Sequence, residues 1–333
     1  MDGLQKKNRQ YVVFSCPEMD WLRQDLAARK PQWFVPGSID FKYFPDGTPN
    51  IFIHDIDKIS NRHVLFLASF HDYRSKYSCI STIYVLTRSM VRTLTVSLPF
   101  IDTATMERVD REGVVATADV DAWMLSSLPQ VNGPTTFIVY DLHTLQNRFY
   151  FHNGALLKMA TGVNLLKEKL DQINDHEWTM APTEYLDNFD GITTEWVICF
   201  PDAGSEKRFG NQFKEYPTIV CKKVREGDQR YVAIDSGDAK GRHVVIVDDL
   251  VQTGGTLLET REALVKAGAL KVSAYATHAI FPNESWKRMV GKFEHFFTTN
   301  SHPNSQQLKD VKPFWILSIA SDLTGHLLAD PDA

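Results

Sequence analysis

The stretch from His243 to Thr256 constrains the fold of this chain more than any other part of the sequence. Its first residues, His243 to Val247, are mostly β-branched and apolar, which is the pattern of a fully buried parallel strand. Asp248 and Asp249 follow where that strand is expected to end. The loop Gln252 to Thr256 supplies two adjacent glycines and two hydroxyls before apolar residues recur at helical spacing. This order of strand, acid pair, glycine loop and helix predicts an α/β fold.

The loop Thr253-Gly254-Gly255-Thr256 has the composition of a phosphate-binding site. Glycines let backbone amides point inward without an obstructing Cβ, and the following helix presents free N–H groups and a positive dipole end to an anion. Asp248 and Asp249 lie one turn away and cannot hold that phosphate, so their expected partners are neutral sugar hydroxyls or a metal ion. A ribose 5-phosphate group satisfies both features. The alternative is an ordinary glycine turn after an acidic strand end.

The composition of the 333-residue chain excludes several classes of function. With 43% hydrophobic and 23% charged residues, it is typical of a soluble globular protein with two domains or one large α/β unit. A net charge of −5 gives no basic footprint for nucleic acid, and no apolar run approaches the roughly 18 residues that cross a bilayer. Residues 1–10 are polar without a signal core, which favours a cytoplasmic location. Scattered cysteines without CxxC spacing predict buried thiols and no zinc site.

Strand and helix patterns alternate along both halves of the chain. They predict two similar domains, residues 1–155 and 156–333, each a mainly parallel sheet flanked by helices. In the second half a helix is expected from about Val163 to Ile173. Residues 174–194 are polar and show no periodic pattern, so a surface insertion or mobile loop is expected there.

A sequence similarity between the two halves of the chain supports two similar domains. The buried strand His63 to Phe70 aligns with His243 to Leu250 at an offset of 243 − 63 = 180 residues. Ala68 and Ser69 then occupy the positions of the acid pair. The first copy is therefore expected to keep the strand and to lack the sugar site. Chance similarity between two buried strands is the alternative.

Three further groups of residues are candidates for metal binding, phosphate binding or catalysis. Asp202 opens a second small-residue loop between a strand and a helix, where a carboxylate can bind Mg²⁺ directly or through water. Lys223 and Arg225 follow a strand on the same side, and two such cations can stabilise a transferring phosphoryl group. His143 ends a buried strand and can bind a metal or a phosphate. Each also has an ordinary structural explanation: a common αβ turn, a solvated strand end and a core histidine.

In this order along the chain, the residues resemble the ribose-phosphate diphosphokinases, or phosphoribosyl pyrophosphate synthetases. The phrases Val-Arg-Glu-Gly-Asp and Val-Asp-Asp-Leu-Val-Gln look most like the plant-type class II enzymes. The resemblance spans roughly Tyr11 to Leu328. It rests on Phe44-Pro45-Asp46-Gly47, Asp141-Leu142-His143, Phe200-Pro201-Asp202-Ala203-Gly204, Lys223-Val224-Arg225 and Asp248 to Thr256.

For the first half, the resemblance implies an ATP site. Phe44 and Asp46 would lie against the adenine, and His143 would serve the phosphates and Mg²⁺. The chain departs from the class I pattern at Thr48, where those enzymes have Glu, and it lacks their Arg-Gln-Asp phrase. Arg108 is the substitute that we expect for the cation of that phrase.

For the second half, the resemblance implies the sugar site and the catalytic cations. Asp202 would bind Mg²⁺, and Lys223 and Arg225 would belong to a catalytic flexible loop. The ribose 5-phosphate would be bound by Asp248, Asp249, Thr253, Gly254, Gly255 and Thr256.

The implied activity is transfer of the diphosphoryl group of MgATP to the anomeric hydroxyl of ribose 5-phosphate, giving phosphoribosyl pyrophosphate and AMP for nucleotide biosynthesis. A homo-oligomer built on dimers is implied as well. Two alternatives are a nucleobase phosphoribosyltransferase, which needs no Phe44 loop, and a non-catalytic synthetase-associated subunit, which would lose cations or acids. Neither nucleic acid nor a membrane is expected as a partner.

Overall fold

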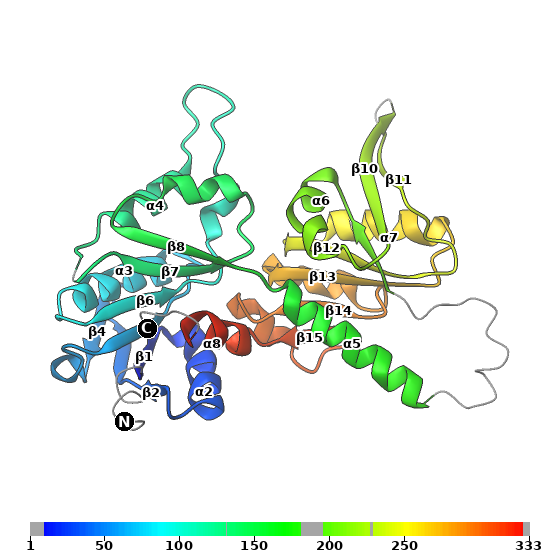
Figure 1. Ribbon diagram of the computed structural model, residues 1–333. Helices are drawn as coiled ribbons and strands as arrows, with labels where there is room; N and C mark the ends of the chain where they lie inside the picture. Colours follow the sequence, from blue (N-terminus) through cyan, green and yellow to red (C-terminus); the bar gives the residue numbers. More distant parts are fainter. Residues whose placement is uncertain (1–9, 131, 181–195, 227–228, 329–333) are drawn as a thin grey trace. The chain divides into compact units, whose positions relative to one another are not determined.

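The chain divides into two compact units in the computed structural model, which describes residues 10–130, 132–180, 196–226 and 229–328 (Figure 1). The first unit comprises Met1–Ala160 together with Ala320–Ala333, and the second comprises Thr161–Ile319. This division lies five residues beyond the expected 155/156 boundary, because the segment Ala155–Ala160 forms an edge strand of the first sheet. The chain also returns to the first unit at Ala320, which the sequence did not indicate.

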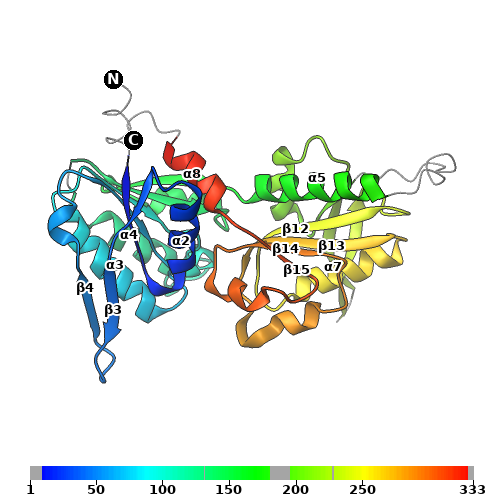
Figure 2. The same ribbon diagram turned by 90° about the horizontal axis from the view of Figure 1, so that it is seen from below.

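The first unit is built on a six-stranded parallel sheet with a protruding two-stranded ribbon (Figure 2). In sheet order the strands are β2 (Phe34–Pro36), β1 (Tyr11–Ser15), β5 (His63–Leu67), β6 (Thr93–Ser97), β7 (Thr135–Tyr140) and β8 (Ala155–Ala160). The antiparallel ribbon consists of β3 (Ile39–Tyr43) and β4 (Pro49–Ile53). The helices are α2 (Asp20–Arg29), α3 (Tyr73–Thr87), α4 (Thr117–Ser126) and α8 (Ala320–Leu328).

The second unit is built on a seven-stranded sheet that is parallel except for one edge strand. In sheet order the strands are β11 (Gln229–Ser236), β10 (Thr218–Glu226), β9 (Trp196–Phe200), β12 (His243–Val251), β13 (Lys271–Ala279), β14 (Phe296–Thr299) and β15 (Phe314–Leu317). β11 is the antiparallel strand. The helices are α5 (Val163–Met180), α6 (Ala203–Phe209) and α7 (Gly255–Lys266).

The central strand β12 shows why its sequence is apolar on both sides. Val244 and Ile246 belong to the core cluster that includes residues of α7, whereas Val245 and Val247 belong to the cluster that includes residues of α5. Alternate side chains therefore enter two cores, one on each face of the sheet. A strand covered on both faces reads as a continuous hydrophobic run.

The two sheets have corresponding strand orders, which confirms the expectation of two similar domains. The order β2-β1-β5-β6-β7-β8 in the first unit matches β10-β9-β12-β13-β14-β15 in the second. β5 and β12 hold the same position in the two strand orders. The aligned histidines His63 and His243 are the first residues of these two equivalent strands. The offset of 180 residues is thus an offset between structural equivalents.

Some expected element boundaries were wrong. α5 continues to Met180, so residues 174–180 are helical, because no glycine or proline interrupts the chain between Val163 and Met180. Residues 181–194 of the expected insertion lie outside the described residues. β12 continues to Val251 because β13 pairs with it as far as Ala279. The acid pair therefore lies inside the strand and not after it.

Candidate functional site

The acid pair near the carboxyl end of β12 is held by two side chains of α6. Asp248 Oδ1 accepts a hydrogen bond from Ser205 Oγ at 2.8 Å and another from the backbone N–H of Asp249 at 3.0 Å. Asp249 Oδ2 forms an ion pair with Nη1 of Arg208 at 2.7 Å. Ser205 and Arg208 are three residues apart on α6, so they lie on one side of that helix. The short helix thus fixes both carboxylates.

The surroundings of Asp248 disfavour its charged form. Burial raises the pKa of Asp248 to about 7, together with the charge of the neighbouring Asp249 carboxylate. The Ser205 hydroxyl acts in the opposite direction, because it donates to the ionised form. A buried carboxyl group whose pKa is raised toward neutral pH is typical of a functional site.

The loop between β12 and α7 has the conformation that its glycines predict. Gly254 has φ +75°, and a Cβ there would lie 2.4 Å from Cε of the buried Met289. A Cβ on Gly255 would meet only Thr253 Oγ1, at 3.9 Å. Within the described part of the chain, no side chain caps α7. Its first-turn N–H groups can therefore bind an anion.

The segment η7 (Pro282–Met289) donates two hydrogen bonds to the backbone of this loop. The sequence did not indicate this contact. Arg288 Nη1 donates to the carbonyl oxygen of Thr253 at 3.0 Å. Ser285 Oγ donates to the carbonyl oxygen of Gln252, also at 3.0 Å. Both contacts restrain the backbone that precedes the turn at Gly254.

Asp202 lies at the carboxyl end of β9, the parallel neighbour of β12. Its Oδ1 accepts from the N–H groups of Gly204 and Ser205 at 2.9 and 3.0 Å, so Asp202 is the N-cap of α6. Asp202 and Asp248 therefore lie near the carboxyl ends of adjacent strands of one sheet, where ligands of open α/β sheets bind. Ser205 contacts both of these acids.

The donor set around Asp202 fits a magnesium ion that is held mainly by a phosphate ligand. In the described residues, no three His, Cys, Asp or Glu side chains gather as a metal cage. Mg²⁺ is commonly held by one or two carboxylates plus substrate phosphates, and it keeps several waters. The partly buried Asp202 carboxylate, near the carboxyl end of β9, can supply one such protein ligand.

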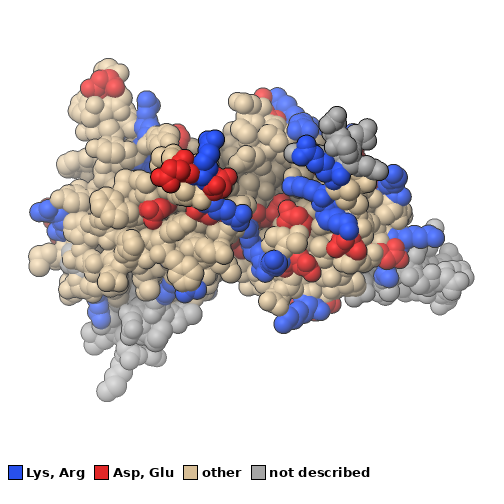
Figure 3. Space-filling view, turned by 90° about the horizontal axis from the view of Figure 1, so that it is seen from above, with Lys and Arg blue, Asp and Glu red and all other residues tan. Residues whose placement is uncertain are grey.

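Lys223 and Arg225 are exposed on β10, inside the ribbon that β10 forms with β11 (Figure 1). The expectation of a loop was wrong for these two residues, because pairing with β11 extends the strand to Glu226. They share one face of the ribbon, as the sequence alternation predicts. Lys222 lies on the other face, where its Nζ is 2.5 Å from Asp235 Oδ1. In the view of Figure 3, Lys and Arg side chains lie beside acidic ones on the second unit.

The expected ATP residues occupy three loops of the first unit. Phe44 and Asp46 form the turn between β3 and β4, where the Phe44 side chain is 52% exposed and the Thr48 N–H donates to Asp46 Oδ1 at 2.9 Å. That hydrogen bond lowers the pKa of Asp46. Arg108 follows β6, is exposed, and its Nε lies 3.1 Å from Glu107 Oε1. His143 follows β7 and is partly buried.

The helix of the first unit that corresponds to α7 is α3, and its N-terminus is capped by a side chain, whereas no side chain of the described residues caps that of α7. At the offset of 180 residues, Thr253 to Thr256 correspond to Tyr73 to Lys76, which contain no glycine. Asp72 caps α3, since its Oδ1 accepts from the N–H of Ser75 at 2.8 Å. A carboxylate of the chain itself thus occupies the place that an anion would take.

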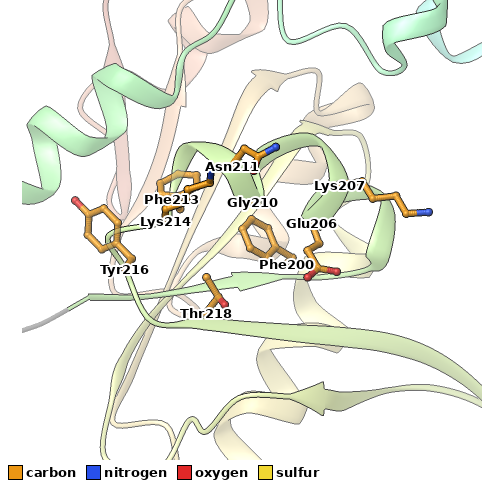
Figure 4. Close-up of a pocket in the computed structure, with 9 residues that line it drawn as sticks. All are labelled: Phe200, Glu206, Lys207, Gly210, Asn211, Phe213, Lys214, Tyr216 and Thr218. Atoms are coloured by element: carbon orange, nitrogen blue, oxygen red, sulfur yellow. The ribbon is translucent and has the colours of Figure 1, made fainter.

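A separate cavity of about 600 Å³ lies on the other side of α6 (Figure 4). On α6 and the adjoining turn it is lined by Glu206, Lys207 and Gly210. At 100° per residue these positions point away from Ser205 and Arg208. The cavity is therefore distinct from the site of the acid pair. Its other lining residues are Phe200, Asn211, Phe213, Lys214, Tyr216 and Thr218.

The structure brings together Asp202, the acid pair and the glycine loop of the second unit, and it adds residues that the sequence did not single out. Lys223 and Arg225 lie on the ribbon of β10 and β11, and no described contact joins them to the acid pair. Asp202, the acid pair and the loop after β12 all lie at the carboxyl ends of β9 and β12. Ser205 and Arg208 were missed, although their spacing of three residues just after a predicted loop-to-helix junction is a signal for a shared helix face. Arg288 had no such signal, because it lies 35 residues beyond its partner Thr253.

Comparisons with known proteins give one result over nearly the whole chain. Residues 201–305 match the phosphoribosyl transferase domain family model. The chain is 41% identical to ribose-phosphate pyrophosphokinase 3, chloroplastic, of Oryza sativa subsp. japonica, over 98% of this chain and 78% of that one. It is 42% identical to ribose-phosphate pyrophosphokinase 3, mitochondrial, of Spinacia oleracea, over 96% and 77%. It is 40% identical to ribose-phosphate pyrophosphokinase 4 of Arabidopsis thaliana, over 97% and 93%.

A solved structure agrees with the fold. The phosphoribosylpyrophosphate synthetase from Mycobacterium smegmatis superposes with a TM-score of 0.76 at 21% identity, covering 96% of this chain and 98% of that one. Both units of the present chain are therefore part of the shared architecture.

Proposed function

The chain belongs to the ribose-phosphate pyrophosphokinase family, and we propose that it transfers the β,γ-diphosphoryl group of ATP to the anomeric hydroxyl of ribose 5-phosphate. The products are phosphoribosyl pyrophosphate and AMP, for use in nucleotide biosynthesis. The observation that carries the proposal is the acid pair of β12 beside the uncapped start of α7. Two carboxylates suit sugar hydroxyls and free helix N–H groups suit a phosphate, so together they suit one sugar phosphate.

The sugar site divides its ligand between two groups of residues. Asp248 and Asp249 accept hydrogen bonds from the ribose hydroxyls, with their orientation fixed by Ser205 and Arg208. The 5-phosphate binds the N–H groups and hydroxyls of the loop from Thr253 to Thr256. Gly254 allows this turn because its positive φ excludes most other residues.

Charge stabilisation by the β10 ribbon accounts for the chemical step. The anomeric hydroxyl attacks the β-phosphorus in line and gives up its proton to solvent. The bond from that phosphorus to the α-phosphate oxygen breaks, and AMP leaves with the bonding electron pair. Lys223 and Arg225 stabilise the negative charge that spreads over the transferring group. Positioning and electrostatics suffice for such a transfer, so no covalent enzyme intermediate is required.

The first unit is proposed to bind the nucleotide. Phe44 offers an exposed ring for the adenine, and Asp46 lies two residues away in the same turn. Arg108 and His143 follow neighbouring strands β6 and β7 and are proposed to serve the phosphates and Mg²⁺. The capped start of α3 supports a single sugar site per chain, located in the second unit.

Removing magnesium is expected to abolish activity, and Asp202 is the proposed ligand of the second unit. When bound, Mg²⁺ neutralises phosphate charge and polarises the reacting phosphorus. Asparagine caps a helix as well as aspartate does, so Asp202→Asn retains α6 and removes only the charge. We expect a roughly tenfold rise in the Mg²⁺ concentration for half-maximal rate, at an unchanged unfolding temperature. An unaltered Mg²⁺ dependence would remove Asp202 from the metal site.

Binding of ribose 5-phosphate is expected to weaken below neutral pH. Because the pKa of Asp248 is raised to about 7, this carboxyl group becomes protonated as the pH falls and loses acceptor capacity. We expect kcat/KM for ribose 5-phosphate to be roughly tenfold lower at pH 6 than at pH 8. The substrate phosphate also titrates, so the profile of Asp248→Asn is the control. Identical acid limbs in the two proteins would show that Asp248 is not the titrating group.

The products that the purified protein forms distinguish the proposed function from the two alternatives, a phosphoribosyltransferase and a non-catalytic subunit. Purified protein with MgATP and ribose 5-phosphate is expected to form AMP and phosphoribosyl pyrophosphate. A phosphoribosyltransferase would leave ATP intact and release pyrophosphate from phosphoribosyl pyrophosphate in the presence of a base. A non-catalytic subunit would do neither. The presence of the acids, the glycine loop and both cations argues against the non-catalytic alternative.

We further propose a homo-oligomer built on dimers, without nucleic acid or a membrane as partner, located in the cytoplasm. Among the described helices, none combines the length and apolarity needed to cross a membrane. The names of two relatives specify the chloroplast and the mitochondrion. Cell fractionation followed by detection of this protein tests whether it lies in the cytoplasm or in an organelle. Recovery of the protein in an organelle fraction would exclude the cytoplasm.

A further inference from the structure

Ser205 connects two acids that lie near the carboxyl ends of β9 and β12, Asp202 and Asp248. Its backbone N–H donates to Asp202 Oδ1 at 3.0 Å, and its hydroxyl donates to Asp248 Oδ1 at 2.8 Å. The residue is only 5% exposed, so the hydroxyl cannot exchange this partner freely for water. Its backbone is fixed by the helix cap while its side chain is fixed by the carboxylate. Ser205 is thus a rigid link within the second unit.

The effect of this link falls on one oxygen of Asp248. Oδ1 receives both the Ser205 hydroxyl and the backbone N–H of Asp249. With two donors on Oδ1, rotation of the carboxylate is restrained, and Oδ2 takes part in neither bond. When Asp248 is ionised, these hydrogen bonds are charge-assisted, and such bonds are strong and directional. The orientation of the carboxylate is therefore set before any ligand arrives.

We propose that Ser205 is a positioning residue of the sugar site, which holds Asp248 so that Oδ2 accepts a ribose hydroxyl. The inference rests on the proposed function, in which Asp248 binds the sugar. Ser205 contributes affinity for ribose 5-phosphate through the orientation of Asp248 and without touching the sugar. Pre-organised acceptors of this kind lower the cost of binding.

The test compares two variants at position 205 with a control on the same helix. Ser205→Ala removes the donor and is expected to raise KM for ribose 5-phosphate roughly tenfold, as loss of a hydrogen bond to a charged group predicts. KM for ATP and kcat are expected to change less than about twofold. Ser205→Thr keeps a hydroxyl and should restore most of the affinity. Glu206→Gln, exposed on the far side of α6, should behave as the unmodified protein.

A double-mutant cycle with Asp248→Ala, together with the single variant Asp248→Asn, distinguishes failure of this inference from failure of the proposed function. If Ser205 acts through Asp248, adding Ser205→Ala to Asp248→Ala, which leaves no acceptor for the hydroxyl, gives no further rise in KM. If Asp248→Asn raises KM but Ser205→Ala does not, the positioning role is overturned and the sugar site stands. If Asp248→Asn itself leaves KM unchanged, the assignment of the sugar site fails. A Ser205→Ala protein with a lower unfolding temperature and equally raised KM for both substrates would show a merely structural role.

Discussion

Replacing Lys223 by alanine is expected to lower kcat by a factor on the order of 100 to 1,000, with changes in KM of less than about threefold for either substrate. The side chain is exposed on one face of the ribbon formed by β10 and β11, and no packed core depends on it. Its proposed partner is the charge on the transferring diphosphoryl group, which is largest in the transition state. An interaction made mainly in the transition state affects turnover more than binding.

Lys222 supplies a matched control for this prediction. It is the adjacent lysine on the same strand, but its ammonium group is paired with Asp235 on the opposite face of the ribbon. Lys222→Ala removes the same charge from the same strand, so it is expected to leave kcat within about twofold, since exposed ion pairs contribute little. Steady-state kinetics of both variants make the comparison. Equal losses in both would point to a general effect of charge, and near-normal turnover of Lys223→Ala would remove it from catalysis.

Replacing Gly254 by alanine is expected to raise KM for ribose 5-phosphate by at least about 30-fold. Alanine at φ +75° costs about 1–2 kcal/mol, and its Cβ would have to displace the Met289 methyl group within the core. The turn can escape this strain only by changing the conformation that presents the N–H groups of α7 to the phosphate. KM for ATP is expected to stay near its usual value, because the proposed nucleotide residues belong to the first unit.

A Gly255→Ala variant tests whether the effects of Gly254→Ala come from backbone strain or only from the added methyl group. A Cβ on Gly255 meets ordinary van der Waals space, with Thr253 Oγ1 at 3.9 Å, and its φ is not in the left-handed region. The unfolding temperature of Gly255→Ala should therefore stay unchanged, whereas that of Gly254→Ala should fall by several degrees. Both values come from thermal unfolding followed by circular dichroism. Unchanged stability and affinity in Gly254→Ala would mean that the turn does not need its present geometry.

The local structure of the candidate site in the second unit could be predicted well because its residues are consecutive. Strand β12, the acid pair and the loop up to Thr256 follow one another, so their order alone specified a strand, a glycine turn and a helix. The same is true of Asp202, which lies directly between β9 and α6. A parallel sheet brings the carboxyl ends of its strands to one edge, and the separate motifs are assembled by that rule.

What the sequence could not supply depends on pairing between distant segments. Lys223 and Arg225 were expected in a loop, because nothing in residues 217–226 announces the antiparallel partner β11. The contacts of Ser205 with Asp248 and of Arg208 with Asp249 join residues that are about forty positions apart. Such contacts follow from sheet register, which hydrophobic periodicity does not specify. The return of the chain to the first unit at Ala320 was missed for the same reason.

Diphosphoryl transfer requires that the sugar oxygen attack the β-phosphorus of ATP. The most direct test uses ribose 5-phosphate with ¹⁸O in its anomeric hydroxyl, MgATP and purified protein, and follows the ³¹P signals of the products. The predicted result is AMP without label and phosphoribosyl pyrophosphate with ¹⁸O in the bridge between the sugar carbon and phosphorus. Formation of ADP, or loss of the label from that bridge, would contradict the proposed reaction.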